Sequence, residues 1–263
     1  SCRMSVRKSR QIGSTSGAGD GMKQQIRICT ASDGVRIAYA VAGSGPPLVK
    51  AANYLTHLEH DWNSPVWQHW WQGLSETHQL IRYDARGSVL SDWNVTSYSM
   101  NDWVRDLEAV LDALNLDHIA LLGISQGASV CVAYAVKHPE RVSHLVLYGG
   151  YARGRFHRNL DEQGIQEAEA MIHMIRVGWG KDNPAFRQLF STMLMPDANA
   201  EQMASLMNWH ISRRPRRTPR KWNAPFMRLM SSILLPKSER PPWCCTLARM
   251  PTSPWRKAGC WQT

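Results

Sequence analysis

Apolar and polar residues alternate in two segments near the start of the chain, Ile26–Cys29 and Val35–Val41. Alternation with a period of two is typical of strands that bury one face. The segment Ser32–Gly34 between them has the composition of a tight turn, so the pattern predicts an antiparallel hairpin. Two further short apolar runs, Leu48–Lys50 and Gln79–Tyr83, are also expected to be strands.

Helical periodicity is present over Val66–Leu74 and is clearest over Met100–Leu114, where apolar residues recur every three or four positions. The run Ile119–Leu122 is continuously apolar, as expected of a strand that is buried on both faces. A helix over Gln126–Lys137 and a strand over Val142–Leu147 follow. Strands that alternate with helices after an initial hairpin predict an α/β fold with a mostly parallel sheet, and such sheets bind ligands at the carboxyl ends of their strands.

The rest of the chain divides into three segments around this core of residues 24–150. Residues 151–208 are rich in Met and aromatic residues, contain no strand pattern, and are expected to form a helical cap. Residues 1–23 lack periodicity and are expected to be a disordered leader, within which Met22 is a candidate first residue. Residues 209–263 are rich in Pro and Arg, and we expect them to be disordered.

One motif has the context of a catalytic site. The string Gly123-Ile124-Ser125-Gln126-Gly127 lies between the buried strand and the next helix, which is the context of a nucleophile elbow. In such an elbow the Ser takes a strained turn that exposes its hydroxyl, and Gly on each side leaves room for the neighbouring elements. Ser125 is therefore the candidate nucleophile, and the amide of Gln126, at a helix N-terminus, is a candidate oxyanion-hole donor. The alternative is an ordinary Gly-rich turn.

Around this motif the chain resembles the α/β-hydrolase family, over about residues 25–207. The stretches SDGVRIAYAVAGSGPPLVK, HLEHDWNSPVW, RYDARGSVLSDW, LLGISQGASV and HPERVSHLVLYGG are most similar to bacterial members that occur alone or fused to LuxR-type regulators and nucleotide cyclases. The resemblance implies an α/β-hydrolase fold with an eight-stranded sheet, a Ser-acid-His triad in that order, and an oxyanion donor in the loop after the third strand. The candidate for that donor is the amide of Asn53, which could alternatively make a turn of its own.

Three positions qualify the resemblance. Val89 stands at the second Gly of the family loop D-x-R-G-x-G-x-S, and we expect the loop to shift if that Gly has a positive φ. The pair Asp84 and Arg86 in the same loop is expected to be a structural ion pair. Ala128 replaces a Gly of close relatives, which is harmless in a helix.

Other candidate groups favour structural roles. His57 and His60 lie beside the presumed oxyanion hole and could touch a substrate, but solvent-exposed loop histidines are the simpler interpretation. The six Cys have no paired zinc-ligand spacing, so we expect no metal, no cofactor and reduced thiols. Four Trp have near-helical spacing that predicts core packing rather than a cofactor cage: Trp62, Trp67, Trp70 and Trp71.

The positive charge of the chain lies in its last segment. The chain has 31 Lys and Arg against 21 Asp and Glu, a net charge of +10. From Trp209 onwards there are 12 basic residues and one acid, Glu239, whereas the preceding residues hold 19 bases and 20 acids. A neutral body with a basic tail indicates either a domain boundary or a segment with a different origin.

Composition excludes several classes of protein. No run reaches the ~18 apolar residues of a membrane helix, and no apolar segment follows the N-terminal charges, so we expect a cytoplasmic protein without membrane partners. Twelve Trp and a charged fraction of 20% exclude a wholly disordered chain. Nothing in the sequence indicates an oligomeric state.

The expected triad is incomplete. The resemblance places the acid after the strand that follows the cap and the His after the last strand, yet the chain has no Asp after Asp197 and no His after His210. Ser125, Asp197 and His210 keep the required order, but Asp197 and His210 lie at or before the end of the cap, so we set this triad aside.

The genetic code offers an explanation of the basic tail. Read from the third base of each codon, Trp243–Gln262 is compatible with V-L-H-x-x-x-D-A-x-V-P-x-E-E-G-x-x-L-A, and several of these residues are forced whichever codons are used. That string resembles the seventh strand, acid loop and following helix of the family. We therefore predict a frameshift near Asn208 that removes the seventh and eighth strands, the acid and the His.

Three functions remain open at this stage. The first is a serine hydrolase of ester-type bonds, with a small-molecule acyl substrate, that is inactive in this chain because its triad is incomplete. The second is a non-catalytic module of a signalling or transcription regulator that binds a ligand or a partner. The third is nonspecific nucleic-acid binding by the tail, without sequence-specific recognition, through Arg213, Arg214, Arg216, Arg217, Arg220 and Lys221.

Overall fold

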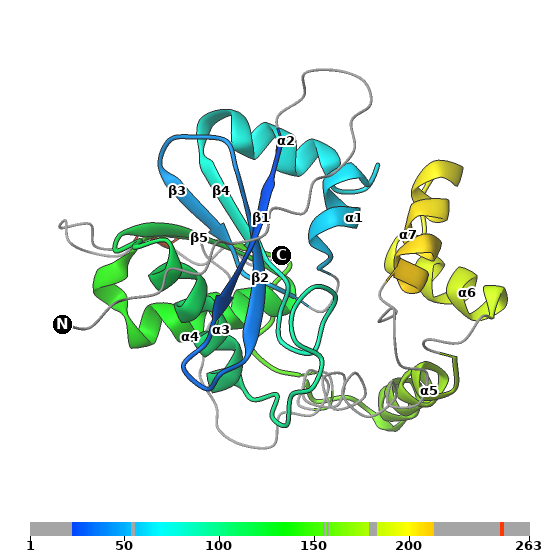
Figure 1. Ribbon diagram of the computed structural model, residues 1–263. Helices are drawn as coiled ribbons and strands as arrows, with labels where there is room; N and C mark the ends of the chain where they lie inside the picture. The colour runs from blue at the N-terminus through cyan, green and yellow to red at the C-terminus, as the bar shows by residue number, and fades with distance from the viewer. Residues whose placement is uncertain are drawn as a thin grey trace, which may run out of the picture.

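The structure is a computed structural model that describes residues 23–53, 56–154, 156, 158–178, 183–212 and 248–249 (Figure 1). The expected leader, apart from Lys23, and most of the expected basic tail lie outside these residues. The chain limits of the leader, core, cap and tail therefore stay predictions.

A mixed sheet of seven strands forms the centre of the molecule, with the spatial order β1-β2-β4-β3-β5-β6-β7. The pairs β4/β3, β3/β5 and β5/β6 are parallel, whereas β1 and β2 form the predicted antiparallel hairpin. This topology confirms the α/β-hydrolase fold class. The strands are β1 (Gln25–Thr30), β2 (Arg36–Ala42), β3 (Pro47–Lys50), β4 (Gln79–Tyr83), β5 (Ile119–Ile124), β6 (Val142–Tyr148) and β7 (Ala248–Arg249).

Strand β7 lies within the expected basic tail. Its two residues run antiparallel to His144 and Leu145 of β6. In the described part of the chain, the sheet beyond β6 consists of this two-residue strand alone. The absence of the C-terminal strands of the family stays a prediction, because most of the tail lies outside the described residues.

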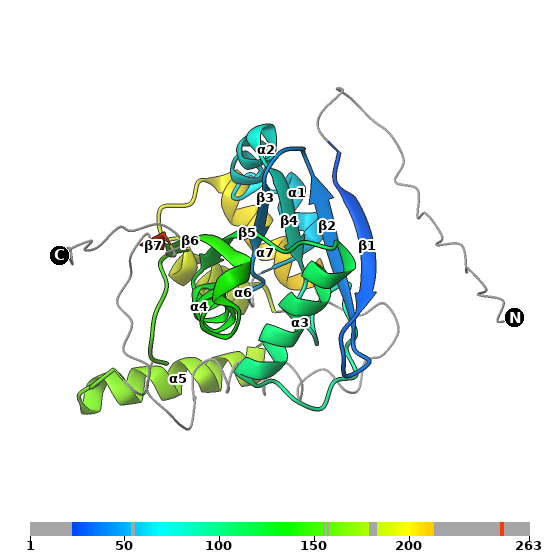
Figure 2. The same ribbon diagram turned by 90° about the vertical axis from the view of Figure 1, so that its left-hand side faces the viewer.

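Helices cover both faces of the sheet (Figure 2). Successive residues of a strand point to opposite faces, so Leu48 packs with the cluster that contains Trp71, and Val49 packs with the cluster that contains Leu107. The first face is covered by α1 (Leu58–Asn63) and α2 (Gln68–Thr77), and the second by α3 (Met100–Ala113) and α4 (Gln126–Lys137). The central strands β3, β4 and β5 are thus buried on both sides, whereas β1 at the edge is mostly exposed.

The helix before β4 was predicted incompletely. The sequence pattern predicts one helix over Val66–Leu74, but the chain forms α1 as well as α2. Helix α1 has only six residues, and His57 caps it by accepting the His60 N–H at its side-chain nitrogen. A helix of six residues with only two apolar side chains, Leu58 and Trp62, is too short for apolar periodicity to be detected. A short 3-10 helix, Pro139–Arg141, was also missed, between α4 and β6.

The segment after β6 is helical, as predicted. It contains α5 (Glu162–Gly178), α6 (Pro184–Leu194) and α7 (Ala200–Ser212), which lie together beside the sheet in Figure 1. Helix α7 continues four residues beyond the expected cap boundary at residue 208, and the side chain of Trp209 is buried. The hydroxyls of Ser64 and Ser205 are 2.9 Å apart, which ties α7 to the loop before α2.

A buried cluster of charges joins the loop after β4 to α3. The guanidinium of Arg86, 2% exposed, forms ion pairs of 2.7 Å with Asp106 and with Asp33, and Asp102 lies 3.6 Å away. Burial raises the pKa of the Asp106 carboxyl to about 6, and hydrogen bonds from Arg86 oppose that rise. Burial acts to lower the pKa of Arg86, but the carboxylates outweigh it and hold that pKa above its ordinary value. Arg86 thus takes its partners from α3 and the β1–β2 turn instead of from Asp84.

None of the helices in the described residues combines the length and the apolar character that a membrane crossing requires.

We expect Asp106→Asn to lower the free energy of unfolding by about 3 kcal/mol, because it removes the carboxylate on α3 that pairs with the buried Arg86 guanidinium at 2.7 Å and leaves only Asp102 there, at 3.6 Å. The matched control is Asp112→Asn on the same helix, whose carboxylate is 64% exposed and pairs with Arg141 at 3.0 Å. We expect a change of under about 1 kcal/mol for this exposed pair. Urea unfolding at pH 7 measures both values, and equal effects would contradict the assignment of Arg86 as a buried structural cation.

Candidate active site

Three loops meet at the carboxyl ends of adjacent parallel strands. Strand β5 lies between β3 and β6, so the residues that follow these three strands are neighbours in space. Asn53 follows β3, Ser125 follows β5 and Tyr151 follows β6. The sheet topology therefore gathers the sequence-predicted nucleophile and the predicted oxyanion loop at one edge of the sheet.

Ser125 occupies a strained turn between β5 and α4. Its backbone has φ 53° and ψ −121°, a conformation that residues other than Gly rarely adopt. The turn is held by two backbone hydrogen bonds, in which the Ser125 N–H donates to the Tyr148 carbonyl at 2.9 Å and the Ala128 N–H donates to the Ser125 carbonyl at 3.1 Å. This is the conformation that the elbow motif predicts.

The glycines on either side of Ser125 are required by close backbone contacts. A Cβ on Gly123 would lie 2.5 Å from the Cα of Ala128, and a Cβ on Gly127 would lie 2.9 Å from the Ala51 carbonyl oxygen. A Cβ on Gly150 would lie 2.5 Å from the Cβ of Ala128. A side chain at any of these three positions would collide with its neighbours. Helix α4, the loop after β3 and the loop after β6 can therefore pack this closely around the turn only because glycine occupies the contact positions.

The Ser125 side chain is half-buried and forms a hydrogen bond with the Tyr151 hydroxyl. Burial raises the pKa of Tyr151, although Arg158, whose guanidinium lies 4.8 Å from the centre of the tyrosine ring, opposes that shift. The phenol is therefore neutral at pH 7. A neutral phenol can donate a hydrogen bond to Ser125 but is a poor acceptor of its proton.

The two candidate oxyanion donors differ in their surroundings. Gln126 is the first residue of α4, where backbone amides point away from the helix and carry partial positive charge. Asn53 is buried, and its N–H donates to the Thr56 hydroxyl at 3.0 Å. The Asn53 amide thus stabilises a turn within its own loop, which is the alternative to an oxyanion-donor role that the sequence left open. A small cavity of about 10 Å³, roughly the room of one water molecule, is lined by residues that include Asn53, Gln126 and Asp106.

The histidines near this loop differ from expectation. His57 is buried rather than solvent-exposed, because its ring caps α1 and its backbone N–H donates to the Asp61 carboxylate at 2.9 Å. His60 is half-buried. Trp62 and Trp71 are core residues, as the spacing predicts, and Trp67 and Trp70 pack against them.

Val89 has a backbone conformation in the left-handed region that favours Gly. Its φ is +42°, and the loop is held by the Ser91 hydroxyl, which donates to the Asp84 carbonyl at 2.6 Å, and by the Leu90 N–H, which donates to the Asp84 carboxylate at 3.3 Å. That the loop is shifted relative to the family stays a prediction. The strain stays at Val89, whose β-branched side chain crowds the backbone at positive φ.

The remaining candidate groups lie away from the described site or outside it. Asp197 is exposed in the loop between α6 and α7, and the His210 side chain is outside the described residues, as is the Arg-rich run of the tail. Among the described residues, no three His, Cys, Asp or Glu side chains are placed to hold a metal ion. Cys29 and Cys131 are buried free thiols, and burial raises their pKa values to about 11 and about 12.

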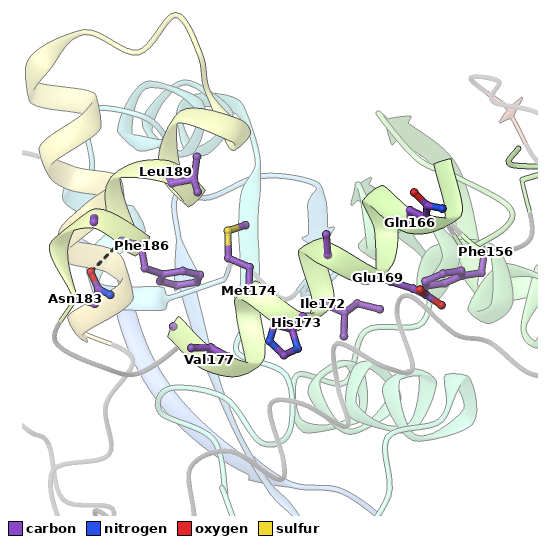
Figure 3. A pocket seen from close by; sticks show the side chains of 13 residues that line it. Phe156, Gln166, Glu169, Ile172, His173, Met174, Val177, Asn183, Phe186 and Leu189 are labelled. Atoms are coloured by element: carbon purple, nitrogen blue, oxygen red, sulfur yellow. Dashed lines mark hydrogen bonds between the residues drawn. The ribbon is translucent and has the colours of Figure 1, made fainter. Parts of the chain in front are cut away.

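A large cavity lies in the helical segment after β6 rather than at Ser125. It has a volume of about 1170 Å³ and is lined from Phe156 to Leu189, mostly by α5 and α6. Figure 3 shows Ile172 and Met174 of α5 and Phe186 of α6 among its mainly apolar side chains. Of the residues that the structure describes around Ser125, none lines this cavity.

Comparison with known proteins is consistent with this geometry. The sequence pattern of the family described as alpha/beta hydrolase fold matches residues 55–226, which is about two thirds of the chain and extends beyond Asn208. The chain is 33% identical over 129 residues to the cis-3-alkyl-4-alkyloxetan-2-one decarboxylase of Shewanella oneidensis, covering 48% of this chain and 38% of that protein. It is 31% identical over 137 residues to the 2-hydroxy-6-oxononadienedioate/2-hydroxy-6-oxononatrienedioate hydrolase of Paraburkholderia xenovorans, covering 52% and 43%. The chain thus spans about two fifths of the length of these curated relatives.

Solved structures show the same fold. The esterase RhEst1 of Rhodococcus sp. ECU1013 is similar with a TM-score of 0.59 at 23% identity, covering 80% of this chain and 72% of the esterase. The esterase EaEST of Exiguobacterium antarcticum gives 0.58 at 22% identity, covering 81% and 74%.

We expect Val89→Gly to raise the free energy of unfolding by about 1 kcal/mol, because it relieves a β-branched residue at positive φ. The matched control is Asn115→Gly, at φ 51°, where Asn already tolerates the left-handed region and the gain should be no more than a few tenths of a kcal/mol. Urea unfolding compares the two variants. A Val89→Gly protein that is less stable than the wild type would show that the Val side chain contributes more than the strain costs.

Proposed function

Because the chain belongs to the alpha/beta hydrolase fold family, we propose that it is a serine hydrolase of ester-type bonds whose catalytic step is impaired in this chain. Ser125 is the proposed nucleophile, which attacks the carbonyl carbon of a small-molecule acyl substrate. The amides of Gln126 and Asn53 are the proposed donors to the oxyanion that forms, and Asn53 would exchange its bond to Thr56 for this purpose. The protein is proposed to act in the cytoplasm.

The strained backbone of Ser125 is the observation that carries the proposal. A residue other than Gly at φ 53° is costly, by about 1–3 kcal/mol, and persists only where the surroundings impose it. Here three glycine contacts impose it and leave the hydroxyl half-exposed at the carboxyl edge of the sheet. An ordinary Gly-rich turn has no need to place a Ser at the strained position.

The impairment follows from the missing base. A Ser hydroxyl without an adjacent base stays protonated at pH 7 and is a weak nucleophile. The neutral Tyr151 phenol that contacts Ser125 cannot replace an imidazole in this role. An oxyanion hole alone can leave ~10³-fold catalysis over water, so the proposed activity is low rather than zero.

A reading-frame change in the gene is the proposed reason for the missing triad residues. The support is the shifted translation of Trp243–Gln262 and the basic, Pro-rich composition of the tail. The sequence predicts the change of frame near Asn208, but the family match extends to residue 226 and favours a later position, between residues 226 and 243.

A ligand-binding module without catalysis is the second candidate function. The cap cavity of about 1170 Å³ favours it, because this cavity has an apolar lining suited to an organic ligand and lies apart from Ser125.

Nonspecific binding of nucleic acid by the tail is kept as a third proposal. Filter binding at increasing salt concentration tests it.

We expect a fluorophosphonate probe to label Ser125 in a protein translated from the frame-restored gene within minutes, and to label the present chain at least ~10³-fold more slowly. Ser125→Ala is the control in both proteins and should abolish the adduct, which peptide mass spectrometry locates. A frame-restored protein that folds but is not labelled would contradict the hydrolase proposal and favour the ligand-binding module.

Genomic sequencing of the codons for Met203–Trp243, compared with the genes of neighbouring species, should reveal an insertion or deletion that is not a multiple of three. A gene that is collinear with its neighbours across this region would refute the frameshift.

A further inference from the structure

Lys50 is buried at the carboxyl end of a central strand. It is the last residue of β3, lies between Arg82 of β4 and Leu122 of β5, and is 3% exposed. A lysine in such a position loses the hydration of its ammonium group, which is unfavourable unless partners in the protein compensate for it. The sequence pattern gives no sign of this, because the residue simply ends an apolar run.

The partners of Lys50 belong to the loop that holds the proposed oxyanion donor. Its Nζ donates to the side-chain oxygen of Asn53 and, at 3.1 Å, to the Thr56 hydroxyl. That hydroxyl accepts the Asn53 N–H at 3.0 Å and donates to the Asn53 carbonyl at 2.8 Å. One ammonium group thus fixes both the side chain of Asn53 and the group that its amide contacts.

Titratable groups from four parts of the fold act on this ammonium. They are Asp61 of α1, Arg82 of β4, Asp84 after β4 and Cys131 of α4, and the ring of Trp71 of α2 has its centre 6.0 Å from Nζ. Burial lowers the pKa of Lys50 to about 8; the carboxylates oppose this shift, and the Arg82 guanidinium adds to it. The group is therefore charged at pH 7 and loses its charge in mildly alkaline solution.

We propose that Lys50 is a positioning residue for the oxyanion donor, because its buried ammonium fixes Asn53 through the Asn53 side chain and Thr56. This proposal rests on the proposed function for its catalytic meaning, but the coupling of Lys50 to Asn53 is a property of the fold alone. Loss of the charge turns two charge-assisted hydrogen bonds into weaker neutral ones, so Asn53 is held less firmly above pH 8.

Hydrogen exchange of the Asn53 amide tests this coupling in the full chain. We expect Lys50→Met, which keeps the length of the side chain, to lower the protection factor of Asn53 by about tenfold at pH 7. In the wild type that protection factor should fall between pH 7 and pH 9, and in Lys50→Met it should be constant. Lys137→Met on α4 is the control, because Lys137 is 58% exposed and pairs with Glu108 at the surface. It should behave as the wild type.

Global stability and the protection of the Asn53 amide should change in opposite directions with pH. This difference distinguishes a positioning role of Lys50 from a merely structural one. The folded pKa of about 8 lies below the unfolded value near 10.5, so the unfolded state binds more protons between these two pH values. The stability of the wild type relative to Lys50→Met should therefore rise with pH in this range, while the protection of Asn53 falls.

Three outcomes would overturn the proposal. These are an unchanged Asn53 protection factor in Lys50→Met, an equal loss of protection across all of β3 and β5, and a wild-type Asn53 protection factor that is constant from pH 7 to pH 9. The last needs no variant, so the test holds even if Lys50→Met fails to fold. Because the readout does not require Ser125 to react, absence of fluorophosphonate labelling in the frame-restored protein, with this coupling intact, refutes the proposed function alone.

Discussion

The close approach of four backbone segments around Ser125 is the constraint on which this fold depends. Strand β5 precedes the turn, α4 follows it, and the loops after β3 and β6 pack against it. Gly123, Gly127 and Gly150 are the contact points, each with less than 3 Å of room for a Cβ. The positive φ of Ser125 follows from this packing and needs no help from the side chains of a triad. The elbow therefore persists in a chain whose sequence lacks the expected acid and His.

Most of the strands and helices of the core could be predicted from the sequence because their signals are local. The limits of β4 and α4 agree with their apolar patterns, and the Ser32–Gly34 turn has the positive φ at Gly34 that its composition predicts. Helix α1 could not be predicted, because its six residues are too few to show a helical period. The order of the strands is also not a local property, and the sequence patterns do not predict it; the resemblance to the family predicted the fold class alone.

Buried charge is the part of the structure that the sequence concealed most. Residues 1–208 have nearly equal numbers of acids and bases, which would suit a neutral surface. In the structure Lys50, Arg82 and Arg86 are each at most 3% exposed, and buried Asp residues accompany them. Apolar periodicity identifies a core by its hydrophobic residues and counts a charge as a break in the pattern. Such reasoning does not detect hydrogen-bonded charged residues inside the core. The proposed role of Lys50 therefore follows only from the structure.

The backbone geometry of the proposed active site and the reactivity of its serine depend on different parts of the chain. The strained turn, the helix N-terminus at Gln126 and the loop around Asn53 are all built by residues 50–151, within the described core. The proton acceptor that would make Ser125 a strong nucleophile must come from elsewhere in the chain, and the group that contacts Ser125 here is the neutral phenol of Tyr151. The proposed nucleophile and the proposed oxyanion donors are thus positioned by residues before the expected cap, whereas in the proposed function activation of the nucleophile depends on residues after it. A change confined to the C-terminal segment can therefore remove the reactivity and leave the site's backbone intact.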